Sequence, residues 1–215
     1  MKFKLMPVLL PLAVITMTLS VYSAVPGHIQ QLQQTKRCER CDLSGANLQG
    51  ANLSYAKIDG SKLNGANLSS ANLNYATLSS IDFYGANLSG AILTNAYFRY
   101  AYLANTNLSG VNLKGSEFAT AYLSQGVNLS SANLSGLDLS NVTWFRVNLS
   151  RANLSGANLN NAVLINVDLS GANLSGANLR YAKLQNANLQ GANLKGANLC
   201  NATLPGGQVS QQGCR

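Results

Sequence analysis

A phrase of five residues, Ser-Gly-Ala-Asn-Leu, is written twice in succession within residues 169–179, and variants of it fill the chain from 41 to 206. A large apolar residue recurs at every fifth position over residues 43–123 and, after one slip, over residues 129–204. This central residue is Leu in 28 of the 33 units, and the residue two positions earlier is Ala in 22 of them. Such regularity predicts a stack of small equivalent units rather than a globular domain.

The five-residue period indicates short extended segments. In Ala-Asn-Leu, side-chain alternation puts Ala and Leu on one face and Asn on the other. Ser and Gly then suit a turn. A helix is disfavoured, because a period of five does not keep one face at 3.6 residues per turn. Five units carry another central residue: Ile58, Phe83, Phe98, Phe118 and Trp144.

The Ala-(Asn/Asp)-Leu-X-X motif closely resembles the pentapeptide-repeat family over residues 41–206. The resemblance implies an all-β fold, a right-handed quadrilateral β-helix in which four units make one coil. The 33 units then give about eight coils, and residues 20 apart stack on one another. Phe98 should therefore lie over Phe118, with the larger core residues gathered in the middle coils.

One slip interrupts the pattern, because six residues separate Leu123 from Leu129 where five are expected. The pattern resumes at once, so the extra residue should bulge at a corner formed by Ser124, Gln125 and Gly126. Two interpretations stay open. The bulge is either a tolerated insertion or a device that aims neighbouring side chains at a partner.

The ends of the chain differ from the repeats. Residues 1–23 have the basic start and apolar stretch of a signal peptide, with an uncleaved membrane anchor as the rival. The apolar run is shorter than the ~20 residues that a membrane span needs. Residues 24–40 predict an N-terminal cap with a short helix that presents Ile29 and Leu32 on one face. Residues 207–215 form a polar tail that should fold over the last coil.

The chain has four cysteines, at positions 38, 41, 200 and 214. An exported chain meets an oxidising compartment, where paired cysteines form disulfides. The coil geometry implied by the family separates the first two cysteines from the last two by most of the rod. We therefore expect disulfides Cys38–Cys41 and Cys200–Cys214, each fixing a cap. A redox-active dithiol at Cys38 and Cys41 is the alternative.

The sequence contains no constellation typical of an enzyme. His28 is the only histidine and has no neighbouring acid in the sequence, and the acidic residues fall on outward positions without pairing. No phosphate-binding glycine loop is present, since the glycines belong to the turns. We expect no catalytic, cofactor-binding or metal-binding residues and no cofactor.

Exposed aromatic and basic residues gather at outward or corner positions of the middle coils, where other units mostly have Asn, Ser or Gly. Tyr and Arg are common in protein interfaces, whereas stacked Tyr can also simply stabilise a sheet. Tyr55 and Tyr75 form a second pair that is expected to be structural. The candidate partner surface consists of Tyr84, Tyr97, Arg99, Tyr100, Tyr102, Tyr122, Phe145 and Arg146.

These features favour a non-enzymatic, exported scaffold that binds an unknown protein. Export and the short helix before the first cysteines resemble family members of photosynthetic bacteria, which implies the periplasm or thylakoid lumen. Without Lys2 and Lys4, 13 basic residues remain against 7 acidic ones, a net charge of +6. This charge opposes the alternative of a DNA mimic that protects topoisomerases. No nucleic-acid partner and no stable membrane insertion are expected, and the chain is a monomer or an end-to-end or side-to-side dimer.

An ice-binding or glycan-binding face is a further alternative. It would need an unbroken ladder of one residue type on one side. The sequence analysis places Asn on all four sides, which argues against it.

Overall fold

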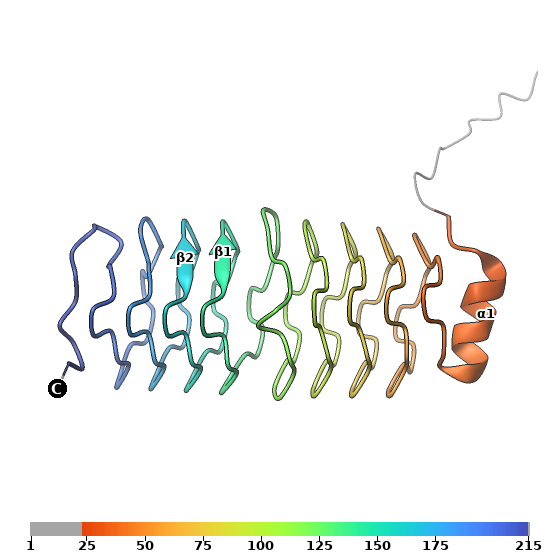
Figure 1. Ribbon diagram of the computed structural model, residues 1–215, viewed down its shortest axis with the longest axis horizontal. Helices are drawn as coiled ribbons and strands as arrows, with labels where there is room; N and C mark the ends of the chain where they lie inside the picture. Colours follow the sequence, from red (N-terminus) through yellow and green to blue (C-terminus); the bar gives the residue numbers. More distant parts are fainter. Residues whose placement is uncertain (1–22, 215) are drawn as a thin grey trace, which may run out of the picture.

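The computed structural model describes residues 23–214, which form a straight rod with one helix at its N-terminal end (Figure 1). Helix α1 comprises Pro26–Thr35, and the assigned strands β1 and β2 comprise Thr143–Phe145 and Val163–Ile165. The signal peptide predicted for residues 1–23 falls, except for its last residue, outside the described residues.

The coils stack through isolated parallel β-bridges between residues 20 apart, or 21 apart across the slip. The bridges form four ladders, one on each face of the rod. We number the faces by their first members: face 1 starts at Arg37, face 2 at Asp42, face 3 at Asn47 and face 4 at Asn52. This arrangement is the quadrilateral β-helix that the family resemblance implies.

Each unit contributes one extended segment and one corner. The segment is too short to form more than one bridge with its neighbour, and only β1 and β2 pair in three-residue register, with Trp144 opposite Leu164. Corners from Arg40 to Asn201, except the one at Thr120, place one residue in the left-handed region, with φ from 54° to 86°. Gly and Asn suit this conformation, which explains why they are frequent there.

The core is a continuous column of the inward residues of each unit, nearly all of them fully buried. Its largest members are in contact near the middle of the rod. The ring of Phe98 lies 5.3 Å from that of Phe118, edge to face, and Phe118 lies 6.4 Å from Trp144. The predicted stacking of Phe98 and Phe118 is confirmed.

The predicted N-terminal helix is also confirmed, although it begins two residues before His28. Pro26 occupies the first turn, where its missing N–H costs nothing, and Leu32 is fully buried against the first coil. The backbone N–H of Val25 donates to Asp42 O at 3.1 Å, and the N–H of Asp42 donates to His28 Nδ1 at 3.0 Å. The helix therefore closes the edge of the first coil.

The C-terminal tail closes only half of the last coil. Leu199 N–H donates to Gln212 O at 3.0 Å, and Thr203 forms an antiparallel bridge with Val209. These contacts cover faces 1 and 2, as the sequence led us to expect of a tail that folds back. On faces 3 and 4, Leu189 and Leu194 remain partly exposed.

The four cysteines form two disulfides. The Cα atoms of Cys38 and Cys41 are 5.4 Å apart, and those of Cys200 and Cys214 are 4.8 Å apart. The first pair lies at the start of the first coil, and the second ties the tail to the last coil. Each pair therefore lies at one end of the rod.

The inserted residue lies where the sequence predicts it. Tyr122 pairs with Tyr102 at the regular spacing of one coil, whereas the spacing between Asn128 and its partner Asn107 is longer by the inserted residue. The extra residue is thus absorbed between Tyr122 and Asn128, at the corner that ends in Gly126. A side chain there would clash with Asn105 Oδ1, and φ is 86°, so the corner requires glycine.

The disturbance extends beyond this corner. The face 1 ladder stops at Glu117 and restarts at Asp138, and the face 2 ladder stops at Tyr122 and restarts at Thr143. Among the described residues, no backbone hydrogen bond joins 115–126 to 135–145. We call this opening the seam. Figure 1 shows the even spacing of the coils interrupted there, in the green part of the rod next to β1.

Thr120 explains why the opening begins before the inserted residue. It occupies the left-handed position of its corner, yet it alone among the corners described from Arg40 to Asn201 lacks a positive φ. A β-branched residue is strained in that conformation. The corners of the two preceding coils are joined by a hydrogen bond from Ser80 N–H to Arg99 O at 2.7 Å. The equivalent bond to the corner of Thr120, from Tyr100 N–H to Ala119 O, is not formed.

Candidate partner surface and the seam

The outward side chains differ sharply between the four faces. On faces 3 and 4 every ladder position is Asn except Asp168 and Ile92. Face 2 has no Asn, and face 1 has it only in its last three positions. The earlier interpretation that Asn occupies all four sides is therefore wrong, because the slip and the four-unit coil hide the segregation when the sequence is read linearly.

The Asn residues of faces 3 and 4 are used for structure. Their side-chain oxygens accept backbone N–H groups two residues later, as Asn107 Oδ1 does from Ser109 N–H at 3.1 Å. Their amide nitrogens donate to the Asn of the preceding coil, as Asn107 Nδ2 does to Asn87 Oδ1 at 3.1 Å. Because these side chains bond to the rod itself, the variety of outward side chains in the ladders lies mainly on faces 1 and 2.

The candidate partner surface lies on faces 1 and 2 and their corners, and all eight of its residues are exposed. The rings of Tyr84 and Tyr102 are stacked at 6.5 Å, and those of Tyr100 and Tyr122 lie at 6.4 Å. Tyr100 is 59% exposed and Tyr122 58%, so about half of each ring surface is free for contact. These four tyrosines therefore lie side by side on the rod.

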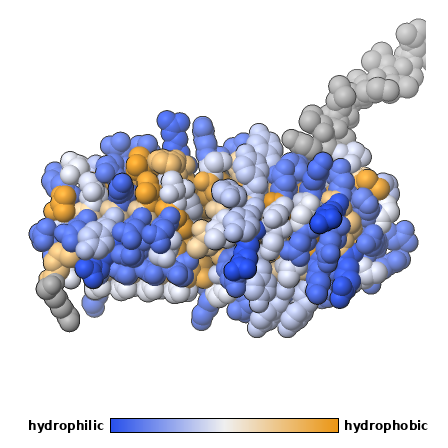
Figure 2. Space-filling model, viewed as in Figure 1, coloured by the Kyte–Doolittle hydropathy of each residue, from blue (hydrophilic) through white to orange (hydrophobic). Residues whose placement is uncertain are grey.

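The seam divides this surface. Phe145 and Arg146 lie beyond it on the coil of β1, where Phe145 pairs with Ile165 of β2. Figure 2 shows hydrophobic side chains gathered over the coils of β1 and β2 on the face in view. The other six members lie on the N-terminal side, so the structure forms two groups rather than one patch.

Two hollows open along the seam. The one on face 1 has a volume of about 250 Å³ and is lined by Arg99, Ser116, Glu117, Phe118, Ala119, Thr120 and Asp138. The other, of about 470 Å³, opens between Tyr100 and Tyr122 on one side and Asn141–Thr143 on the other. Both exist because the two ladders are interrupted.

The face 1 hollow is rich in charge. Arg99 Nε lies 3.2 Å from Glu117 Oε2 in an exposed ion pair. The Ser140 hydroxyl and then its backbone N–H hold the pKa of Asp138 below its usual value, which outweighs the upward effect of burial. Asp138 therefore stays ionised at neutral pH. The sequence analysis did not select Glu117, Asp138 or Ser116, since their approach depends on the opened ladder.

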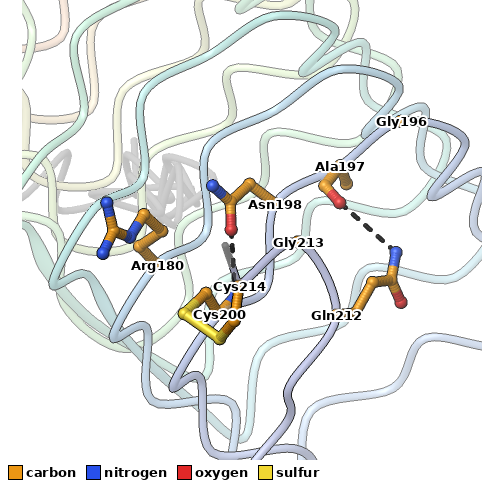
Figure 3. A pocket seen from close by; sticks show the side chains of 8 residues that line it. All are labelled: Arg180, Gly196, Ala197, Asn198, Cys200, Gln212, Gly213 and Cys214. Atoms are coloured by element: carbon orange, nitrogen blue, oxygen red, sulfur yellow. Dashed lines mark hydrogen bonds between the residues drawn. A yellow bond between two sulfur atoms is a disulfide. The ribbon is translucent and has the colours of Figure 1, made fainter.

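A third hollow lies at the C-terminal end, with a volume of about 620 Å³ (Figure 3). The Cys200–Cys214 disulfide forms one wall, and Gln212 Nε2 donates to Ala197 O at 3.3 Å on another. Arg180 reaches its rim, with its guanidinium 5.4 Å from the centre of the Tyr181 ring. We interpret this hollow as the space beneath the folded tail.

Three further observations concern metal binding, membrane spans and the histidine. Over 23–214, no three His, Cys, Asp or Glu side chains come together as metal ligands. No helix in that range is long and apolar enough to cross a bilayer. His28, the only histidine, is bound to the backbone of Asp42.

Family models match most of the repeat region. The model for pentapeptide repeats matches residues 91–126, 145–180 and 177–211, and the model for a pentapeptide repeat region matches residues 34–108. The chain belongs to the pentapeptide-repeat family. The unmatched stretch within the repeats, residues 127–144, directly follows the inserted residue and includes one side of the seam.

Several solved structures of the family are similar to this chain. HetL of Nostoc sp. strain PCC 7120, described as involved in heterocyst differentiation regulation, is 27% identical over 88% of this chain and all of its own, with a TM-score of 0.28. A form of QnrB1, a plasmid-mediated fluoroquinolone resistance protein, is 26% identical over 70% of this chain and 75% of its own, with a TM-score of 0.37. A protein of the Arabidopsis thaliana thylakoid lumen is 25% identical over 61% and 68%, with a TM-score of 0.18. No curated protein matches the chain in sequence.

Proposed function

We propose that this protein is a non-enzymatic scaffold that acts outside the cytoplasm and binds a protein partner through faces 1 and 2 of its middle coils. The observation that carries the proposal is the segregation of outward residues. Faces 3 and 4 are ladders of self-bonded Asn, whereas exposed Tyr and Arg occupy faces 1 and 2. Aromatic and Arg side chains are the residues that most often dominate protein interfaces.

The absence of enzymatic activity is part of the same proposal. The aspartates in the ladders of faces 1 and 2 accept backbone N–H groups, as Asp82 does from Tyr84 at 3.0 Å, and Glu117 is paired with Arg99. Catalysis by a carboxylate needs a group free to exchange a proton with a substrate. A binding role needs only the exposed rings.

The cysteines and the N-terminal sequence support the proposed extracytoplasmic location. Each disulfide closes one end of the rod, and such bonds persist in oxidising compartments. The periplasm or the thylakoid lumen provides that environment. N-terminal sequencing of the purified mature protein tests this step, since cleavage near Ser23 is expected and an intact Met1 would contradict it.

The partner surface can be tested by photo-crosslinking in the producing cells. A benzophenone amino acid at position 122 is expected to trap a specific partner, because Tyr122 is exposed beside the seam. Position 75 is the matched control, since Tyr75 is also exposed and is stacked on Tyr55 at 5.0 Å, outside the proposed surface. Equal products from both positions, or none from 122, would contradict the proposal.

A second experiment replaces the tyrosines by alanine. Tyr102→Ala with Tyr122→Ala should abolish recovery of the crosslinked partner by affinity capture, whereas Tyr55→Ala with Tyr75→Ala should leave it unchanged. Circular dichroism checks that both variants are folded. Equal recovery with the two variants would show that the tyrosines of faces 1 and 2 only stabilise the rod.

A further inference from the structure

Ser116 is the unusual residue in the face 1 hollow, because its side chain is polar, 91% buried and without a hydrogen-bond partner. Two other residues at the same inward position are satisfied by the preceding coil. The hydroxyl of Ser61 donates to Cys38 O at 2.6 Å, and that of Thr106 donates to Phe83 O at 2.8 Å. A buried hydroxyl without a partner is unfavourable, so Ser116 Oγ would gain from a donor that reaches it from the hollow that Ser116 lines.

The charges around Ser116 favour a cation. Glu117 and Asp138 contribute two carboxylates from opposite sides of the seam, and Arg99 compensates for one of them. The hollow therefore keeps a net negative charge in a molecule that is basic overall. Backbone carbonyls of the interrupted ladder add further acceptors nearby.

We propose that this hollow binds the ammonium group of a lysine side chain on the partner, an inference that rests on the proposed function. An ammonium has three N–H donors, and four oxygen-bearing side chains line the hollow: Ser116, Glu117, Thr120 and Asp138. Phe118 and Ala119 line the same hollow and can cover the methylene stem of the lysine. The partner's backbone can also meet the unpaired N–H and C=O groups at the seam edges.

Other cations fit the hollow less well. Ca²⁺ takes six to eight oxygen ligands, whereas two carboxylates and two hydroxyls, those of Ser116 and Thr120, line this space. An arginine would bring a planar fork of five donors that pairs best with a carboxylate in bidentate geometry. Arg99 of this chain already holds Glu117, which leaves a site for a smaller point charge.

The inference can be tested by nuclear magnetic resonance on the full mature protein. The probe is the blocked peptide acetyl-Gly-Lys-Gly-amide, with its Nζ-acetylated form as the neutral control. Only the charged peptide should shift amide signals of residues 115–120 and 138–140. The inference would be overturned if the neutral peptide caused the same shifts or if these residues did not shift. It would also be overturned if CaCl₂ displaced the peptide and shifted the same amide signals.

Charge variants make the test specific. Asp138→Asn and Glu117→Gln should each weaken peptide binding up to about fivefold, the range of an exposed ion pair. Asp168→Asn is the matched control, because Asp168 makes the same bonds on face 3, to Ser170 N–H and Asn188 Nδ2. Arg99→Gln should strengthen binding, since it frees Glu117. Equal effects of Asp138→Asn and Asp168→Asn would overturn the lysine site.

The two proposals can fail separately. If Asp138→Asn leaves crosslinking at position 122 intact and the peptide gives no shift, the lysine site is wrong and the partner surface stands. If position 122 traps nothing while the charged peptide binds at the seam, the lysine site stands without the proposed tyrosine surface.

Discussion

Phe118 carries the core across the seam, and its truncation tests whether the rod unfolds as one unit or as two. Its ring is 99% buried and touches Phe98 on one side and Trp144 on the other. On faces 1 and 2 no backbone hydrogen bond crosses at this level, so aromatic packing is the main link between the two halves there. In a repeat protein, cooperativity depends on such nearest-neighbour interfaces.

Replacing Phe118 by Ala should cost about 3–5 kcal/mol, the range for a buried Phe, of which each aromatic contact supplies about 0.5–1.5 kcal/mol. Because the lost contacts span the seam, the substitution lowers the free energy of interaction between the two halves rather than the stability of either half. We expect Phe118→Ala to separate one unfolding transition into two. Each half keeps complete coils of its own, so both remain folded in water.

Urea denaturation can detect this separation, because Trp144 is the only tryptophan and lies just beyond the seam. Its fluorescence reports locally, whereas far-ultraviolet circular dichroism reports on the whole rod. The two transitions should coincide in the wild type and diverge in Phe118→Ala. Phe98→Ala is the matched control, since Phe98 is equally buried but its ladder is intact on both sides. Coincident transitions in Phe118→Ala, or equal divergence in Phe98→Ala, would refute this account of the seam.

Three further predictions concern the corner glycine, the tail and the outward acids. Gly126→Ala should lower the free energy of unfolding by about 1–3 kcal/mol, measured in urea, because the side chain meets Asn105 at a positive φ. Cys200→Ser with Cys214→Ser should cost about 3 kcal/mol for a loop of this size and lower the melting temperature. The pKa of Asp138 is lowered in the folded state, so its carboxylate stabilises the fold at pH values above its pKa in the unfolded chain. This stabilisation is lost as pH falls below about 5. Asp138→Asn should therefore reduce the acid-induced loss of stability between pH 7 and pH 2.5.

The glycine prediction has a control in the same rod, and the other two have an outcome that would contradict them. Gly136→Ala meets only backbone strain, since nothing lies within 4 Å of the added Cβ, so a cost equal to that of Gly126→Ala would contradict the clash. Exposure of the tail amides to hydrogen exchange should increase in the double serine variant. An unchanged tail would show that the disulfide does not hold it. An acid titration that is identical for wild type and Asp138→Asn would contradict the pKa argument.

The regular parts of the fold could be predicted because a single physical rule repeats. Alternation of Ala, Asn and Leu sets which side chains point inward, and the five-residue period sets the corners. The helix of the cap was also predictable from Ile29 and Leu32. The pairing of Tyr102 with Tyr122 followed from counting one full coil along the chain, as their bridge confirms.

The seam could not be predicted with the same rule, because it depends on how neighbouring coils accommodate a local misfit. The extra residue is visible in the sequence, but its effect on face 1 is not. A signal does exist at Thr120, a β-branched residue where the corner needs a left-handed conformation. The confinement of Asn to particular faces could also have been predicted from the sequence. It appears when each coil of 20 residues is written as one row and the row that contains the slip is given 21 residues.

The unequal joining of the two halves has a mechanical consequence. At the seam the coils are tied together by the ladders of faces 3 and 4 and are untied on faces 1 and 2. Thermal bending at this level is therefore directional. The coils separate on faces 1 and 2, and the bending axis runs along the bonded faces 3 and 4. A rod of this kind is stiff in one plane and compliant in the other, and it bends where the proposed partner surface is divided.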